Sequence, residues 1–313
     1  MKPQLEGLLP IAKPSGITSH DVVDVVRKVM RVRRVGHAGT LDPQATGLML
    51  ICLGRATRMT EYLFDLDKEY IAQMVLGATT DTEDSDGQIT DEQPTDHLTE
   101  AAIRDQFGNF VGVIQQKPPM LSATHHEGKR LYELARQGIE VERKSRPVTV
   151  YRLEMLECCV QGNRKIVKYR TVCSRGTYIR TLCADIGKAL GCGAYLNSLI
   201  RTEVGPFQLS QAYSLPDLSM LARTKELHSK IWTMNEGLSF FPPVRLTRIQ
   251  AQRLLNGLDA TVTSIEQANE LGNDRRVRVL APGDTFIAVG KLARRGQQWL
   301  CKPEKVFAPP ENT

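Results

Sequence analysis

The sequence predicts an α/β protein that continues into a smaller β-rich unit. Val22, Val26 and Val29 recur at the spacing of one helical face, whereas residues 48–53 form an apolar run with the length of a buried strand. After residue 240, a helical pattern is followed by short alternating segments, which is typical of a small sheet. These patterns predict a larger domain over residues 1–240 and a smaller one over residues 241–313.

Length and charge set the first limits on function. The chain has 313 residues, of which 41% are hydrophobic, so it can bury a sizeable core. Its net charge is +6, but residues 80–105 hold nine acids against one base, which leaves +14 on the rest of the chain. Such a basic remainder suits a polyanionic partner, although a solvated basic surface would have the same composition.

Cysteine usage and the N-terminus indicate a cytoplasmic protein. The seven cysteines are scattered and form no CxxC pair, so neither a disulfide framework nor a metal site is expected. The N-terminus lacks the basic region and apolar core of a signal peptide. No apolar run approaches the roughly 20 residues that cross a bilayer, so no membrane partner is expected.

The first elements lead to a glycine-rich stretch. A turn at residues 13–16 precedes Thr18 and Asp21, which form a capping pair for a helix that carries the three valines. The basic residues that follow form either a solvated helix end or a grip on phosphates. They are Arg27, Lys28, Arg31, Arg33 and Arg34.

Residues 34–54, RVGHAGTLDPQATGLMLICLG, combine glycines with a single carboxylate before the strand. Glycines permit a loop to pass close to a ligand. Pro43 restricts its own backbone and that of Asp42. Asp42 is therefore a candidate catalytic group on a stiffened loop, and a structural Asp-Pro turn is the alternative.

The remaining larger domain alternates between helices and strands. Residues 55–64 and 98–107 are expected to be helical, and residues 68–77 form a strand. The acidic residues 79–94 are expected to form a loop whose charge keeps it away from an RNA groove. Residues 166–173 form a second strand, and an amphipathic helix follows it and stops at Gly191.

Several motifs resemble the TruB family, the tRNA pseudouridine-55 synthases. They are KPSGITSH, GHAGTLDPQATGLMLICLG, KEY, PPMLSA…GKRLYELARQG, CSRGTYIRTLCADIG and GCGAYLNSLIRTEVGPF. The resemblance implies the pseudouridine synthase fold, an α+β fold with a mixed, largely antiparallel sheet, and a C-terminal PUA-like RNA-binding domain. It also implies that an insertion at about residues 79–150 clamps the RNA. Two positions depart from the family pattern, Leu121 in place of a tyrosine and His125 in place of a lysine.

The resemblance assigns roles to six residues. Asp42 corresponds to the catalytic aspartate, and Arg180 to the arginine that pairs with it. Without the resemblance, Arg180 would be interpreted as a surface arginine and Tyr70 as a core residue. The other four correspond to RNA contacts: His37 packs into the RNA where the target base departs, Tyr70 contacts the target uracil, Tyr178 belongs to the uridine pocket, and Leu199 lies under the base.

The implied activity is isomerisation of uridine 55 in the T stem-loop of tRNA by a monomeric enzyme. The reaction oxidises nothing and imports no group, so no cofactor is needed, and the sequence contains no P-loop or dinucleotide motif. Asp42 can act as a nucleophile at C1′ or as a base at C2′, and the residues leave both routes open. The rivals are a glycoside hydrolase, which normally needs a second carboxylate, and an RNA-binding module without catalysis.

Overall fold

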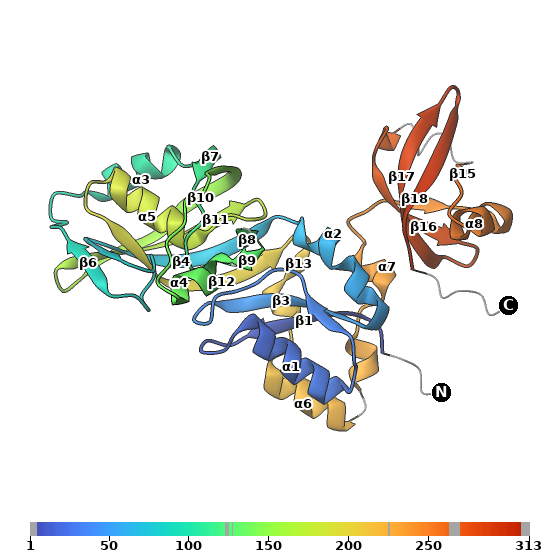
Figure 1. Cartoon of the computed structure of the whole chain (residues 1–313), viewed down its shortest axis with the longest axis horizontal. Coiled ribbons are helices and arrows are strands. Elements are labelled where there is room, and N and C mark those ends of the chain that lie inside the picture. The colour runs from blue at the N-terminus through green and yellow to red at the C-terminus, as the bar shows by residue number, and fades with distance from the viewer. Residues whose placement is uncertain (1–4, 123–124, 127, 225, 263–269, 308–313) are drawn as a thin grey trace.

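A nine-stranded sheet forms the framework of the larger domain (Figure 1). The computed structural model describes residues 5–122, 125–126, 128–224, 226–262 and 270–307. The strand order is β1-β3-β12-β4-β11-β10-β7, with β2 paired to β3 and β13 to β12. Only the pairing of β12 with β3 is parallel, so the expected mixed, largely antiparallel sheet is confirmed. The strands are β1 (Gly7–Lys13), β2 (Val35–His37), β3 (Thr46–Leu53), β4 (Lys68–Leu76), β7 (Gly112–Gln116), β10 (Arg146–Gln161), β11 (Arg164–Cys173), β12 (Ala194–Val204) and β13 (Phe207–Gln208).

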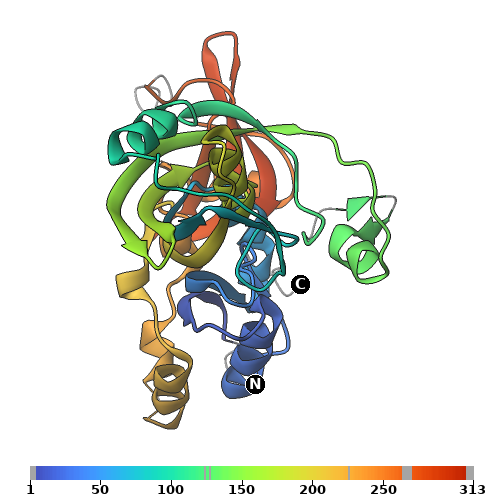
Figure 2. The same ribbon diagram turned by 90° about the vertical axis from the view of Figure 1, so that its left-hand side faces the viewer.

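Helices cover this sheet and close its core. The first helix begins with the expected capping box between Thr18 and Asp21, and it buries Val22 and Val26 completely. Figures 1 and 2 both show this helix beside α6, below the sheet. The expected helix at residues 55–64 is divided into η1 and α2. The helices are α1 (Ser19–Met30), η1 (Gly54–Met59), α2 (Thr60–Phe64), α3 (Glu100–Gly108), α4 (Leu131–Arg136), α5 (Ile179–Ala189), η2 (Leu209–Gln211), α6 (Leu215–Thr224), η3 (Leu227–Lys230) and α7 (Met234–Gly237).

The acidic segment is a hairpin, so the prediction of an irregular loop at residues 79–94 was wrong. β5 (Ala78–Thr80) pairs with β6 (Ile89–Glu92), and the Asp81 carboxylate closes the turn by accepting a hydrogen bond from the Gln88 amide at 2.8 Å. The threonines that flank the acids favour strands, which the abundance of turn residues concealed. Backbone hydrogen bonds hold the turn against β12, from the Ser85 amide to the Leu196 carbonyl at 2.9 Å and from the Leu196 amide to the Glu83 carbonyl at 3.0 Å.

The later part of the insertion stands away from the sheet. It contains β8 (His125–His126), β9 (Lys129–Arg130) and α4, and Figure 2 shows it projecting to one side of the molecule. Residues 123, 124 and 127 and the side chain of His125 lie outside the part that the structure describes.

The expected β-rich C-terminal unit is present. It comprises β14 (Pro243–Arg245), α8 (Arg248–Leu255), β15 (Ala260–Thr261), β16 (Arg276–Ala281), β17 (Thr285–Arg295) and β18 (Gln298–Val306), and its sheet order is β14-β16-β17-β18-β15. Val289 and Phe307 of this unit do not pack in the core of the C-terminal sheet. They pack with Leu8 and Leu48 of the larger domain. Arg55 fixes this junction by donating a 3.0 Å hydrogen bond to the Phe307 carbonyl. The two sheets therefore share buried apolar contacts. None of the described helices is both long and apolar enough to cross a membrane.

Candidate active site

The loop that carries Asp42 lies between β2 and β3 and is tied down from two sides. Ser19 on α1 both accepts a hydrogen bond from the Leu41 amide and donates one to its carbonyl, each at 2.9 Å. Lys13 at the end of β1 donates to the carbonyls of Pro43 at 2.8 Å and Ala45 at 2.7 Å. The Lys13 side chain is buried, and burial lowers its pKa to about 8. Asp42 is thus presented on a backbone fixed directly before and after it.

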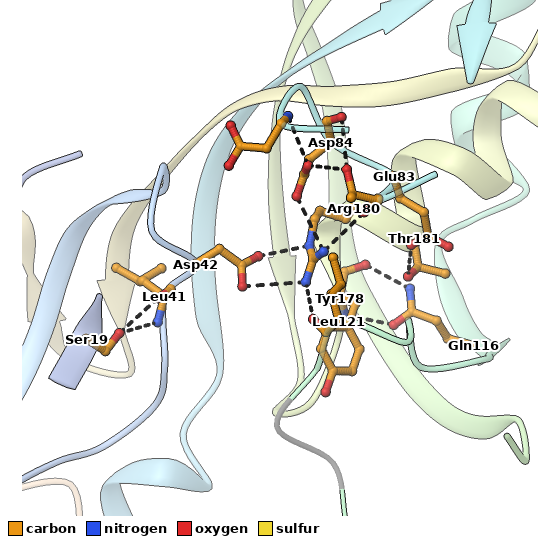
Figure 3. A network of polar contacts seen from close by, with 12 residues as sticks. Ser19, Leu41, Asp42, Glu83, Asp84, Gln116, Leu121, Tyr178, Arg180 and Thr181 are labelled. Atoms are coloured by element: carbon orange, nitrogen blue, oxygen red, sulfur yellow. Dashed lines mark hydrogen bonds and ion pairs between the residues drawn. The ribbon is translucent and has the colours of Figure 1, made fainter. Parts of the chain in front are cut away.

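Arg180 forms a two-pronged contact with Asp42 (Figure 3). Its Nε lies 2.9 Å from Oδ2 of Asp42, and its Nη2 lies 3.5 Å from Oδ1. The arginine comes from the first turn of α5, and its side chain is 5% exposed, whereas that of Asp42 is 43% exposed. The pair predicted from the motifs is therefore formed, and the carboxylate still has a face open to a reactant.

Two other segments also bind the guanidinium of Arg180, through an ion pair and hydrogen bonds. Nη1 lies 3.4 Å from Oδ2 of Asp84 and donates to the Thr82 carbonyl at 3.1 Å. Nη2 donates to the Leu121 carbonyl at 2.8 Å. Thr82 and Asp84 belong to the acidic hairpin turn, so the negative charge of this segment faces a buried arginine. The expectation that the segment does not line an RNA groove stays a prediction.

The surroundings of Asp42 pull its pKa in opposite directions. Burial raises the pKa of this carboxyl above its ordinary value, the Arg180 charge lowers it, and the Asp84 charge raises it again. The net result is a raised pKa. The site therefore holds a carboxyl whose charged form burial disfavours and Arg180 favours, and a raised pKa makes its carboxylate a stronger base.

Tyr70 and Leu199 lie on the neighbouring strands β4 and β12. Each side chain is 8% exposed, and both pack in the same apolar cluster as Leu41, next to Asp42. Burial raises the pKa of the Tyr70 phenol, and the nearby Asp42 charge raises it further. Tyr70 thus feels the charge of Asp42, and Leu199 belongs to the same apolar cluster as Tyr70 and Leu41.

Tyr178 caps the N-terminus of α5, two residues before Arg180. Its amide donates to Oε1 of Gln116 at 2.7 Å, and its carbonyl accepts from Nε2 of Gln116 at 2.9 Å. The Arg146 guanidinium lies 5.3 Å from its ring centroid. Figure 3 shows Tyr178 close to Arg180 and Leu121, and its predicted place in a uridine pocket stays a prediction.

His37 lies outside the Asp42 network. It is half-buried on β2 and lines a cavity of about 460 Å³ that also borders on Tyr62, Phe64, Arg175 and Arg276. Burial lowers the pKa of His37, so its imidazole is neutral at pH 7. The cavity lies where the larger domain meets the C-terminal sheet, because Arg276 begins β16. The predicted RNA contact of His37 remains a prediction.

Sequence reasoning missed three charged residues of the site. Asp84 was hidden in a run of acids, and Lys13 stands in a turn motif that gave no sign of burial. Arg201, on β12, is 1% exposed and donates a 2.7 Å hydrogen bond to the Leu48 carbonyl. Its strand also carries Asn197, Ser198, Thr202 and Glu203, so the sequence pattern does not mark Arg201 as buried, and arginine is seldom fully buried. Within the described ranges, no group of three His, Cys, Asp or Glu side chains could hold a metal ion.

Family comparisons match almost the whole chain. The model of the TruB family pseudouridylate synthase N-terminal domain matches residues 27–179, and that of the tRNA pseudouridylate synthase B C-terminal domain matches residues 180–268. The tRNA pseudouridine synthase B of Dehalococcoides mccartyi (strain CBDB1) is 41% identical over 303 residues, which are 97% of each chain. That of Heliobacterium mobile is 41% identical over 307 residues, covering 98% of this chain and 96% of the relative.

Solved structures share the same architecture. A Cbf5–Nop10–Gar1 complex contains a chain that superposes with a TM-score of 0.73 at 27% identity, covering 97% of this chain and 85% of the other. An H/ACA RNP bound to a substrate RNA containing 2′-deoxyuridine gives a TM-score of 0.72 at 26% identity, with coverage of 97% and 86%. The likeness therefore includes both the large sheet and the C-terminal unit.

Proposed function

We propose, from the premise that this chain belongs to the TruB family of pseudouridylate synthases, that Asp42 is its catalytic residue. The activity is the isomerisation of uridine to pseudouridine in tRNA. The observation that supports Asp42 is its two-pronged contact with Arg180 on a loop held from both sides, with 43% of the side chain accessible. We further propose that the target is uridine 55 in the T-loop.

The chemistry needs one carboxylate and no imported group. The N1–C1′ bond breaks and the uracil turns. C5 then bonds to C1′ and loses its proton, while N1 gains a proton. Asp42 can form a bond to C1′ as a nucleophile, or it can remove the C2′ proton as a base. In both routes Asp42 starts ionised, which the Arg180 charge favours against the cost of burial.

The target base has to leave the T-loop stack to reach Asp42. Tyr70 supplies an aromatic face and Leu199 an apolar surface, and both belong to the apolar cluster that contains Leu41. Tyr178 stands at the other side of Arg180, where it can contact the uridine. Aromatic and apolar contacts of this kind are how proteins hold unstacked RNA bases.

The rest of the T stem-loop is assigned to three surfaces. Basic residues around Arg31 and Arg33 contact phosphates, the projecting insertion clamps the stem, and the C-terminal sheet extends the contact. His37 packs where the target base departs. The enzyme is proposed to work as a monomer.

Release of tritium from a tRNA transcript labelled at C5 of uridine tests the proposal. We expect release equal to the pseudouridine formed, and no release from a transcript whose uridine 55 is replaced by cytidine. Asp42→Asn is expected to bind the same transcript without release, because an amide serves neither as nucleophile nor as base. Glycosidic cleavage to free uracil would indicate a hydrolase, and binding without release by the wild type would indicate an RNA-binding module.

A further inference from the structure

Arg201 is a buried cation that is held by carbonyl groups. None of the described residues supplies a carboxylate in ion-pair contact with it, and its side chain is 1% exposed. Its guanidinium donates to Leu48 at 2.7 Å, to Gly39 at 3.1 Å and to Thr40 at 3.4 Å, in each case to the backbone oxygen. Burying a charge costs free energy unless hydrogen bonds or an opposite charge compensate it. The three carbonyl groups must therefore be held where the Arg201 guanidinium can donate to them.

The three carbonyls lie on both sides of Asp42 in the sequence. Gly39 and Thr40 precede the aspartate and Leu48 follows it, so one side chain closes the loop that carries it. The backbones also approach closely, because a Cβ on Gly47 would lie 2.3 Å from the carbonyl oxygen of Arg201. Gly47 has a φ of 110°, which side chains disfavour. The backbone at Gly47, directly after the Asp42 loop, therefore packs closely against the backbone of Arg201.

The same arginine reaches Tyr70. In the antiparallel pairing of β4 with β12, Tyr70 lies directly opposite Arg201, and opposed residues project to the same face of a sheet. Burial raises the pKa of Tyr70, whereas the charge of Arg201 lowers it. One guanidinium thus hydrogen-bonds the loop of Asp42 and belongs to the residue that faces Tyr70 across the strand pair.

We infer that Arg201 is a positioning residue that fixes the separation between Asp42 and Tyr70. This inference rests on the proposed roles of those two residues. Arg201 itself is sealed from solvent, so it acts through them and does not touch the RNA. Its loss should slow the chemical step while leaving the affinity for tRNA unchanged, because the phosphate-binding surface is not altered.

Arg201→Met tests the inference against a matched control, Arg278→Met. Arg278 also donates to carbonyls, those of Phe241 at 2.8 Å and Asn235 at 3.0 Å; its guanidinium is engaged beside α7, and we assign it no contact with the RNA or with the Asp42 loop. Misplacing a reacting group by 1 Å costs roughly 100-fold in rate. We therefore expect Arg201→Met to lose about 100-fold in single-turnover rate with little change in tRNA Kd, Arg201→Lys to recover part of that loss, and Arg278→Met to keep its rate.

Hydrogen exchange provides a readout that needs no substrate. The amides of residues 39–48 should exchange faster in Arg201→Met than in the wild type, and at wild-type rates in Arg278→Met. If Arg201→Met fails to fold, Arg201→Lys replaces it in both measurements. A wild-type rate with unchanged exchange, or a loss confined to Kd, would overturn the inference. Failure of the proposed function is distinguishable, because the wild-type enzyme would then release no tritium.

Discussion

Replacing Arg180 with methionine removes the cation that lies between two carboxylates. Asp42 and Asp84, 2.9 and 3.4 Å from the guanidinium, would face each other without compensation, and two carbonyls would lose a donor. Removing one partner of a buried ion pair costs about 3–5 kcal/mol. Because 43% of the Asp42 side chain reaches water, we expect the lower end of that range, about 3 kcal/mol.

Thermal unfolding measures this loss. With about 2.1 cal/mol/K of unfolding entropy per residue, one kcal/mol shifts the Tm of this 313-residue chain by about 1.5 °C, so Arg180→Met should melt about 4–5 °C below the wild type. The control is Arg152→Met, since Arg152 is half-exposed and pairs with Glu154 at the surface. This control should change stability by no more than about 0.5 kcal/mol. Equal Tm values for the two variants would refute the reasoning.

The same variant should shift the pH dependence of the reaction. Burial and Asp84 raise the pKa of Asp42 and Arg180 lowers it, so the pKa rises further when Arg180 is lost. A carboxylate is ionised only above its pKa, and the acid limb of the single-turnover rate should therefore move to higher pH. Adding Asp84→Asn removes a charge that raises the pKa and should move the limb back. An acid limb that stays in place in Arg180→Met would contradict this account.

Four further outcomes are expected. Asp42→Asn should abolish turnover yet lower Tm by only a few degrees, because Arg180 keeps Asp84 as a partner; turnover by folded Asp42→Asn would contradict the mechanism. Tyr70→Phe should retain single-turnover activity that Tyr70→Leu loses if stacking alone matters, and should fail equally if the hydroxyl handles a proton. In filter binding, log Kd should vary with log salt with a slope of several units, whereas a flat response would mean that the basic surface faces another partner. Phe307→Ala should lower the free energy of unfolding by about 3–5 kcal/mol in denaturant titration, since Phe307 is 1% exposed in the shared core; a loss below about 1 kcal/mol would count against that junction.

Local patterns were sufficient to predict the elements that carry the site. The Thr18–Asp21 pair and the valine spacing predicted α1, and the glycine-bounded apolar run predicted β3. Both signals involve residues a few positions apart, where sequence spacing translates directly into geometry. The pairing of Asp42 with Arg180 joins residues far apart in the chain, and only the family resemblance predicted it.

The contacts that hold the site in place could not be predicted from the sequence. Asp84 meets Arg180 because a hairpin folds back onto α5, and nothing in the acidic run distinguishes it from its neighbours. Lys13 and Arg201 are cations whose partners are backbone carbonyls, and any residue type can offer a carbonyl. A sequence pattern therefore treats such cations as exposed, which is the usual state of lysine and arginine.

These carbonyl contacts suit a site that receives a polyanion. An ion pair could also have fixed the Asp42 loop, but each added carboxylate would repel the phosphates of the approaching RNA. Lys13 and Arg201 fix the loop by donating to neutral carbonyls, so they leave a positive charge beneath it. The Lys13 charge lowers the pKa of Asp42, and neither cation brings a carboxylate that would repel the phosphates of the RNA. Substituting an acid partner beside either cation should therefore weaken tRNA binding even if the loop stayed in place.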